Sequence, residues 1–472
     1  LTVITGGTPA EYGDVIGGII SVTTSSPSYE VTGGAEYLTS QFLDPYGYHL
    51  GGLNLSGPIL SKYIDSIDYN KPILGFFVAG EYQYEKDQDP AQGGVFRLKE
   101  DAYLDFQENP LTLDESGNFF LNRGNFVTPD MVETSKYKQN NSGSTARINA
   151  RLDFQPSDNI IVKFGGGFSD VNSDQWSIGN SMFAPEANQL FHGRQYSGWG
   201  RFQQTFKTAE GSKVQNLFYQ LQVDWSRYER EFMDANHKRN HFDYGYVGSF
   251  DYDRQEVYRY VDPIANADIH NSDVSSNGYY MTAGFSPVNL SFDPSTSKNP
   301  LQANYNNFIF DYVAENGIVN PFTGIRDYSI RNLDFLSFYG GLRNGDGVDQ
   351  IYSLYSGAGS SQGGYQKTSF DQARMTGQAS GEIKGHAIKV GFEFEQRQER
   401  FWAVGSRALW QYMRQLTNRH LSGINQDPNS WELVMVNGQF QDTVHAPSFF
   451  EESDQSVFDR NLRNVLGLPM GG

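Results

Sequence analysis

The ten residues 145–154, TARINARLDF, decide the fold class of this chain, because apolar and polar side chains alternate along them without a break. The apolar members are Ala146, Ile148, Ala150, Leu152 and Phe154, and the polar members are Thr145, Arg147, Asn149, Arg151 and Asp153. A period of two belongs to a β-strand that has one apolar face and one polar face. The segment therefore predicts a strand.

The same alternation recurs along the chain. After turn-forming residues at 155–159, it resumes at 160–169, which predicts a hairpin, and it returns at 217–226 and 387–395. Counting such segments predicts about nine strands. Their centres lie near residues 37, 52, 78, 149, 164, 201, 221, 377 and 391. The predicted fold class is all-β.

The connections between these strands alternate in length. Short ones are predicted at 155–159, 208–212 and 384–386, and long ones at 86–140, 171–190 and 231–369. Tight turns at one end and long loops at the other are typical of transmembrane barrels of the outer membrane, with periplasmic turns and extracellular loops. Since a structureless loop of this length is rare, we expect strand extensions and small helices inside 231–369.

The amino-acid composition excludes several classes of protein. The 472 residues include 36 Lys plus Arg and 55 Asp plus Glu, a net charge of −19 that argues against a nucleic-acid partner. There is no Cys, which excludes disulfides, thiolate metal sites and cysteine nucleophiles. The longest apolar stretch, 72–80, is too short for a spanning helix, which needs about 20 residues. Barrel strands need only about 9–11 alternating residues, so the mean hydropathy of −0.54 does not argue against a bilayer.

The alternation also predicts which side chains meet lipid, because Arg or Lys on the lipid face costs about 2–4 kcal/mol at the bilayer midplane. We expect the apolar members to face lipid: Ala146, Ile148, Ala150, Leu152, Val162, Phe164, Leu221, Val223, Ile388, Val390 and Phe392. We expect the charged members and Gln222 to face the lumen: Arg147, Arg151, Asp153, Lys163, Gln222, Asp224, Lys389, Glu393 and Glu395. The amphipathic rings of Tyr82, Tyr84, Trp225 and Tyr228 are expected near a membrane interface.

The opening stretch 6–24, GGTPAEYGDVIGGIISVTT, resembles the end of the plug domain of TonB-dependent outer-membrane receptors. The residues that carry the motif are Gly6, Gly7, Pro9, Glu11, Tyr12, Gly13, Gly17 and Gly18. Residues 54–58, 75–82 and 386–393 resemble barrel strands of the carboxypeptidase-regulatory-domain type of these receptors from Bacteroidota. The pattern departs from the SusC-like subgroup, so a SusD-like partner is not implied. A glycine-rich β-turn region is the structural alternative.

The resemblance implies two regions. Residues 1–28 would be the end of the plug, and 29–472 the first part of a barrel of about 22 strands, with extracellular loops at 86–140, 171–190, 231–369 and 403–472. It also implies an outer-membrane transporter for a bulky nutrient, with TonB, outer-membrane lipid, and a surface lipoprotein or other outer-membrane subunits as partners. The signal peptide, the TonB box and most of the plug are expected to lie outside this sequence.

No enzyme and no cofactor are predicted. His237 and His241 have an H-x3-H spacing, but Lys238 stands where a zinc protease needs Glu. The pairs at 87–89 and 251–253 lack the Gly and closing Glu of an EF-hand, although a loop calcium site stays an alternative. Residues 359–363 match Gly-x-Ser-x-Gly without the flanking strand and helix of a nucleophile elbow.

Two rival functions stay open at this point. One is a structural subunit of a larger outer-membrane assembly, and the other is a soluble all-β adhesin or carbohydrate-binding protein. For the barrel, we expect an open arc with its first strand near 31–42 and its last strand beyond residue 400, because a plugged lumen needs more strands than these. We also expect Glu393, or else Glu395, to pair with cations of the plug.

Overall fold

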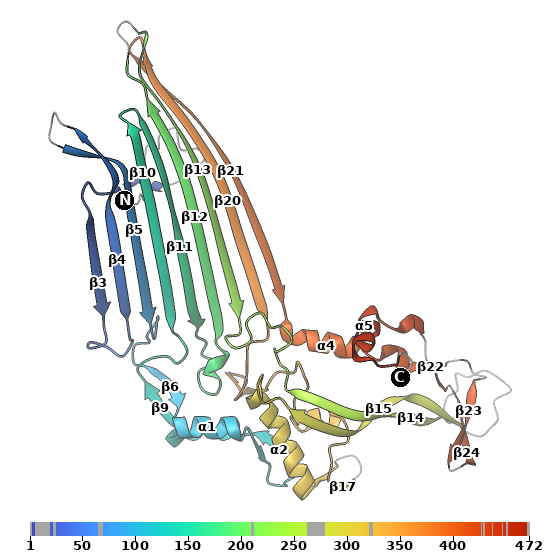
Figure 1. Ribbon diagram of the computed structural model, residues 1–472. Coiled ribbons are helices and arrows are strands. Elements are labelled where there is room, and N and C mark those ends of the chain that lie inside the picture. Colours follow the sequence, from blue (N-terminus) through green and yellow to red (C-terminus); the bar gives the residue numbers. More distant parts are fainter. Residues whose placement is uncertain are drawn as a thin grey trace.

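The computed structural model describes residues 2–4, 19–21, 25–64, 69–208, 212–261, 279–320, 324–425, 427, 430–436, 438–445, 447–449 and 452–469. Its main element is a nine-stranded antiparallel sheet (Figure 1). In spatial order from one edge to the other, the strands are β3 (Thr32–Thr39), β4 (His49–Ile64), β5 (Tyr69–Glu85), β10 (Gly143–Ser157), β11 (Ile160–Gln175), β12 (Gln189–Thr205), β13 (Val214–Met233), β20 (Tyr365–Ile383) and β21 (His386–Val404). Each predicted strand centre falls inside one of these strands, so the predicted fold class is confirmed.

The sheet is an up-and-down meander, and the tight turns that the structure describes between β10 and β11 and between β20 and β21 lie at one end of it. Lys384 and Gly385 alone join β20 to β21, and both have positive φ (52° and 78°), as a type I′ hairpin turn requires. Only residues 158 and 159 join β10 to β11, fewer than the five predicted. The strands are longer than the alternation indicated because their polar ends continue the ladder.

The sheet is open within the described part of the chain. β3 pairs only with β4, and β21 pairs only with β20. The open arc and the position of its first strand agree with the prediction, since β3 falls inside 31–42. The last strand of the sheet was expected beyond residue 400, but β21 begins at His386 and ends at Val404.

The two faces of the sheet differ in chemistry. Directly paired residues of neighbouring strands point to the same side, so the register defines each face. The apolar face carries Ala146, Ile148, Ala150, Leu152, Val162, Phe164, Leu221, Val223, Ile388, Val390 and Phe392. The charged face carries Arg147, Arg151, Asp153, Lys163, Gln222, Asp224, Lys389, Glu393 and Glu395. Side chains of the apolar face are far from buried: Leu221 is 38% exposed and Phe394 is 64% exposed.

The predicted aromatic set divides between the faces. Trp225, Tyr82 and Tyr84 lie on the apolar face, where the rings of Tyr37, His49 and Tyr84 form a stack with centroids 6.2 and 6.5 Å apart. Tyr228 lies on the charged face, because it is an odd number of residues from Trp225. Grouping Tyr228 with an outward-facing interface belt was therefore wrong.

The three long connections fold together into one packed unit at the end of the strands opposite the tight turns (Figure 1). It contains β6 (Val95–Leu98), α1 (Glu100–Glu108), β7 (Leu111–Leu113), β8 (Phe120–Asn122), β9 (Val132–Ser135), α2 (Pro300–Asn316), β16 (Ile318–Val319), β17 (Arg326–Asp327), α3 (Leu333–Phe338), β18 (Gln350–Ile351) and β19 (Tyr355–Ser356). The expected small helices inside 231–369 are thus present. We call it the loop unit.

Helix α2 is the centre of the loop unit. It begins with Pro300, whose fixed φ suits the first helical position, and it ends at Gly317, which has a φ of 66°. Its buried face, with Tyr305, Ile309 and Val313, packs against Leu111 of the first long connection. A second cluster joins Phe106 of α1 to Phe183 of the middle connection. No helix in the described part of the chain is long and apolar enough to cross a membrane.

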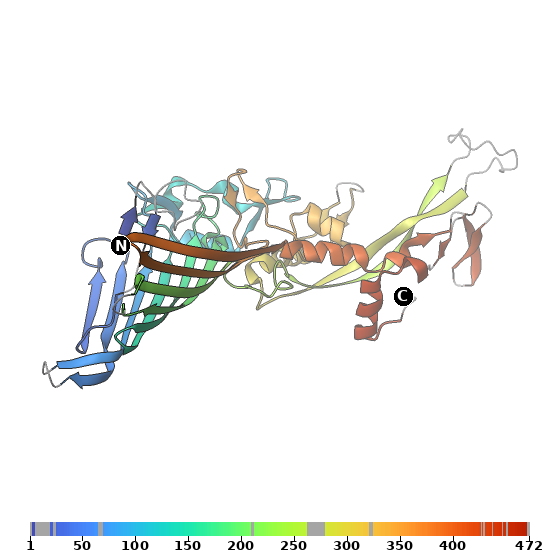
Figure 2. The ribbon, with the colours of Figure 1, turned by 90° about the horizontal axis from the view of Figure 1, so that it is seen from above.

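An arm extends from the loop unit past the β21 edge of the sheet (Figure 2). Its long hairpin, β14 (Gly248–Val261) and β15 (Tyr279–Pro294), forms a four-stranded sheet with β24 (Gln439–His445) and β23 (Trp431–Val436). Helices α4 (Ser406–Leu416) and α5 (Val457–Leu466) belong to the same region, as does the short pair β22 (Gly423–Ile424) and β25 (Ser448–Phe449). A two-stranded pair, β1 (Thr2–Ile4) and β2 (Ile19–Ser21), precedes the large sheet.

Candidate functional site

The charged face is lined by ion pairs that cross from strand to strand. Arg147 of β10 contacts Glu81 of β5 with 2.7 Å between nitrogen and oxygen. Arg151 makes a two-pronged contact with Asp153 two residues on (2.7 and 2.8 Å), and Lys163 of β11 lies 3.8 Å from the same carboxylate. The Arg151 side chain is only 7% exposed, so this group is the most shielded of the predicted set.

A second group lies at the β21 side of the same face. Arg374 of β20 stands between two carboxylates, 3.6 Å from Asp224 and 4.0 Å from Glu393. Glu395 pairs with Arg397 two residues on. Both predicted plug-contacting carboxylates therefore have arginine partners within the sheet, and their pairing with a plug stays a prediction. The predicted charged residues form separate groups along the sheet and do not converge on one point.

The chain approaches β3 across the charged face. The Ser28 amide donates to Ser56 Oγ at 2.8 Å, and Ser56 lies on that face. Gly75 lies there too, and a Cβ atom on it would be 2.7 Å from the Pro27 Cβ, which is too close for any larger residue. The segment between β2 and β3 thus passes on the charged side of the sheet. The glycines of the plug motif, together with Pro9, Glu11 and Tyr12, lie outside the described residues.

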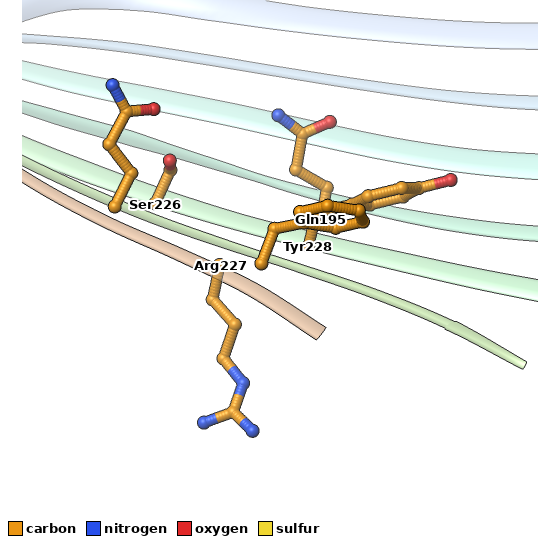
Figure 3. A pocket seen from close by; sticks show the side chains of 6 residues that line it. Gln195, Ser226, Arg227 and Tyr228 are labelled. Carbon is orange, nitrogen blue, oxygen red and sulfur yellow. The ribbon is translucent and has the colours of Figure 1, made fainter. Parts of the chain in front are cut away.

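A hollow of about 300 Å³ opens on the charged face, toward the loop unit. Figure 3 shows Gln195, Ser226 and Tyr228 on one side of the strands and Arg227 pointing to the opposite side. Phe370 and Gln372 complete the lining. By register, Tyr228 is paired with both Gln195 and Phe370, and Ser226 with Gln372.

The hollow combines an aromatic surface with neutral polar groups. The rings of Tyr228 and Phe370 are stacked at 18°, with centroids 6.2 Å apart. The Arg230 guanidinium lies over the Phe370 ring, 5.3 Å from its centroid. Two amides and two hydroxyls can donate or accept hydrogen bonds beside this surface. Such a lining suits a polar ligand with an apolar face.

The hollow was missed by the sequence analysis. The side chains on the charged side of the hollow alternate along their strands as other charged-face positions do, and none of them carries a charge, since the Arg227 side chain points to the opposite side. A signal was nevertheless present: Ser226 and Tyr228 continue the polar set that begins with Gln222 and Asp224, although Tyr228 was counted with the outward aromatics.

The motifs weighed for other chemistry have structural partners. His237 Nε2 lies 2.8 Å from Asn299 Oδ1, and His241 Nδ1 lies 3.0 Å from Ser406 Oγ. Asp87 accepts from the Lys138 amide at 2.8 Å and from Asn141 Nδ2 at 2.7 Å. Across the described ranges, no three His, Asp or Glu side chains are grouped as metal ligands. Ser361 Oγ accepts from Gln302 Nε2 at 3.0 Å and lies in a loop without a flanking helix.

No family model matches the sequence, and no curated protein matches it. Among solved structures, the chain is similar to the FpvAI–pyocin S2 complex, with 12% identity and a TM-score of 0.29 over 83% of this chain and 41% of that one. It is also similar to the siderophore receptor PirA from Acinetobacter baumannii (10% identity, TM-score 0.21, 82% and 62% covered). A third is the ferric enterobactin receptor PfeA from Pseudomonas aeruginosa (9% identity, TM-score 0.19, 76% and 54% covered). The chain spans less than two thirds of each of these proteins.

Proposed function

We propose that this chain forms part of the wall of a TonB-dependent outer-membrane transporter that takes up a bulky nutrient. The observation that carries the proposal is the apolar band on one face of the sheet. On β11 the band ends at Phe168, before Asp170, and on β13 it ends at Trp225, before Arg227. On β21 it ends at Phe394, before Gln396.

The border of this band crosses the strands obliquely. The register connects Phe394 through Met375, Val223 and Gly200 to Phe164, which is four residues before Phe168. Four residues are about 13 Å along a strand, and the four strand spacings from β11 to β21 are about 19 Å. Their ratio gives strands tilted by about 35° to the normal of the band, the lower end of the range for transmembrane barrels. A soluble sheet has no reason to produce this slope.

The height of the band agrees with this geometry. On β13 it runs from Leu217 to Trp225, eight steps or about 26 Å along the strand. At a tilt of about 35°, this corresponds to about 22 Å along the normal, close to the apolar belt of about 25 Å in such barrels.

The open edges favour a larger wall. Unpaired N–H and C=O groups in hydrocarbon cost several kcal/mol each. The edges of β3 and β21 therefore need further strands, and we propose that these complete a barrel of about 22 strands, wide enough for a plug. The passage of Pro27 and Ser28 over the charged face supports a plug on that side, with residues 1–28 as its end.

In this arrangement, the charged face lines the lumen and the loop unit is extracellular. The hollow at Tyr228 and Phe370 then lies in the lumen wall near the outer mouth, where a nutrient would pass. We propose TonB as the source of energy for uptake. The Bacteroidota origin and the carboxypeptidase-regulatory-domain subtype rest on the resemblance of residues 6–24, 54–58, 75–82 and 386–393.

Uptake tests the proposal directly. Cells that lack the intact protein should lose growth on one or more bulky nutrients, and they should recover it with the wild-type gene only when TonB is present. Recovery without TonB would contradict the coupling. Folded protein that stays in solution after detergent is removed would contradict the wall itself.

The arm supports a second candidate, a structural subunit of a larger outer-membrane assembly. Its four-stranded sheet exposes large side chains, including Tyr260 (57%), Trp431 (56%) and Phe440 (58%). Exposed aromatic groups of this kind are enriched at protein interfaces. If cells lacking the protein keep all uptake but lose the assembly of other outer-membrane proteins, this second function is favoured.

A further inference from the structure

Paired charges lie beyond the border of the apolar band on its loop-unit side, from Asp170, two residues past Phe168, to Arg400, six residues past Phe394. We call them the border belt: Asp170 of β11, Arg194 of β12, Arg227 and Glu229 of β13, Asp371 of β20 and Arg400 of β21. The register places Arg194 opposite both Asp170 and Glu229, and Arg227 opposite Asp371. Arg400 is paired with Ser369, two residues from Asp371, so all six lie on the same face as the apolar band.

The carboxylates of the border belt hold its arginines in place. Arg194 Nε lies 3.1 Å from Asp170, and Arg227 contacts Glu229 at 2.5 Å. Asp371 lies between two guanidinium groups, 3.8 Å from Arg227 Nε and 3.2 Å from a terminal nitrogen of Arg400. Arg227 and Arg400 are thus brought to either side of one carboxylate.

The exposure of the two kinds of side chain is unequal. The carboxylates of Asp170, Glu229 and Asp371 are 25%, 17% and 23% exposed. Their partners Arg194, Arg227 and Arg400 are 41%, 39% and 54% exposed. The cations therefore form the outer surface of the belt, although the whole chain carries a net charge of −19.

The carboxylates hold the guanidinium groups in position, and these side chains remain partly exposed. Such groups suit phosphate, because the planar fork of Arg binds phosphate through two parallel N–H donors. The belt begins two residues past the apolar band on β11 and β13 and reaches six residues past it on β21, so in the proposed wall it starts in the headgroup layer of the bilayer and extends outward from there. Ordinary surface ion pairs would add little stability there and would need no such orientation.

We propose that Arg194, Arg227 and Arg400 bind phosphate groups of lipid headgroups in the leaflet on the loop-unit side. The site rests on the proposed membrane wall, and it adds a specific lipid contact to that wall. Arg227 and Arg400, on either side of Asp371, hold one headgroup, and Arg194 supports its neighbour.

The test uses the intact protein, purified in a neutral detergent and titrated with lipid A or with lipid A from which the phosphates have been removed. We expect wild type to prefer the phosphorylated lipid. The double variant Arg227→Gln/Arg400→Gln should bind it at least about tenfold more weakly, a loss of about 1.4 kcal/mol, and bind the dephosphorylated lipid unchanged. The Arg→Lys double variant should recover part of the affinity, because it keeps the charge but not the fork.

Arg374→Gln is the matched control. Arg374 is 39% exposed, as Arg227 is, and it also pairs with two carboxylates, but it lies on the charged face. An equal loss of lipid affinity in this control would overturn the proposal. Equal binding of both lipids by wild type would overturn it too, as would full competition by inorganic phosphate, which would indicate a site for free anions.

The test distinguishes an error in the border belt from an error in the proposed membrane wall. A protein that still requires detergent but shows no phosphate preference contradicts the border belt alone. A protein that is folded and monodisperse without detergent contradicts the wall and the belt together.

Discussion

A charge placed in the middle of the apolar band tests the membrane wall most sharply. Leu221 lies halfway between Leu217 and Trp225, the two ends of the band on β13. Four residues separate it from either end, about 11 Å along the normal at a tilt of about 35°. Leu221→Arg therefore puts a guanidinium near the bilayer midplane.

The expected cost follows from this depth. Arg at the midplane of a barrel's lipid face costs about 2–4 kcal/mol, which lowers the folding equilibrium constant by about 30- to 900-fold. Gln220→Arg is the matched control, because Gln220 is the preceding residue and faces the charged side of the sheet. A charge there stays among polar groups, so we expect a change within about 0.5 kcal/mol.

The assay is reversible unfolding of the intact protein by denaturant in lipid vesicles, followed by tryptophan fluorescence. The amount of each variant assembled in the outer membrane of cells provides a second readout. If the apolar face met water, Leu221→Arg would be an exposed surface substitution with little effect. Equal stability of the Leu221→Arg and Gln220→Arg variants would therefore refute the orientation of the sheet.

Three further results are expected. Glu393→Gln should change plug release or nutrient uptake if this carboxylate also attracts plug cations, whereas unchanged behaviour would leave only its contact with Arg374 at 4.0 Å. Ile309→Ala should destabilise the loop unit by about 2–5 kcal/mol, since Ile309 is fully buried. Hydrogen exchange should increase in α1 and α2 but not in the sheet. An equal increase in the helices and in the sheet would contradict a separate core. The hydrogen bond from Arg123 lowers the pKa of Asp105, so this link is complete above the usual carboxyl pKa of about 4 and is lost as the pH falls through the lowered value. Hydrogen exchange in α1 should rise as the pH falls through this lowered pKa, and Asp105→Asn should remove the pH dependence of exchange. A variant with the same pH profile as wild type would contradict a role for the Asp105–Arg123 link.

The strands and their faces follow from the sequence because they depend on local chemistry. In segments such as 145–154, a period of two fixes both the strand and the side on which each residue lies. A shift of register by one residue would move every apolar side chain to the charged face, so the pattern specifies the pairing strongly. The alternation of short and long connections likewise predicted that all the tight turns lie together.

Single positions within this pattern were harder to assign. Tyr228 has the amphipathic character of an interface residue, but parity places it on the charged face, where it lines the hollow with Phe370. Residue type suggested one environment and strand geometry fixed another. The Arg374 contacts were also missed, because they join β13, β20 and β21, and residues 224 and 374 are far apart in the sequence.

Only the tertiary structure decided the form of the long connections and the slope of the apolar border. Phe106 and Phe183 share one cluster, and Leu111 and Ile309 share another, although each pair joins two different connections. No local period indicates these contacts, because packing between distant segments depends on shape and not on repeat. The slope needs the register of five strands at once, from Phe168 on β11 to Phe394 on β21. By itself, the sequence determined that each strand has an apolar face and a polar face, since that requires only the geometry of one extended chain. How those faces align across the sheet, and which charges meet at their border, depends on hydrogen bonds between strands, and these are set only when the whole sheet assembles.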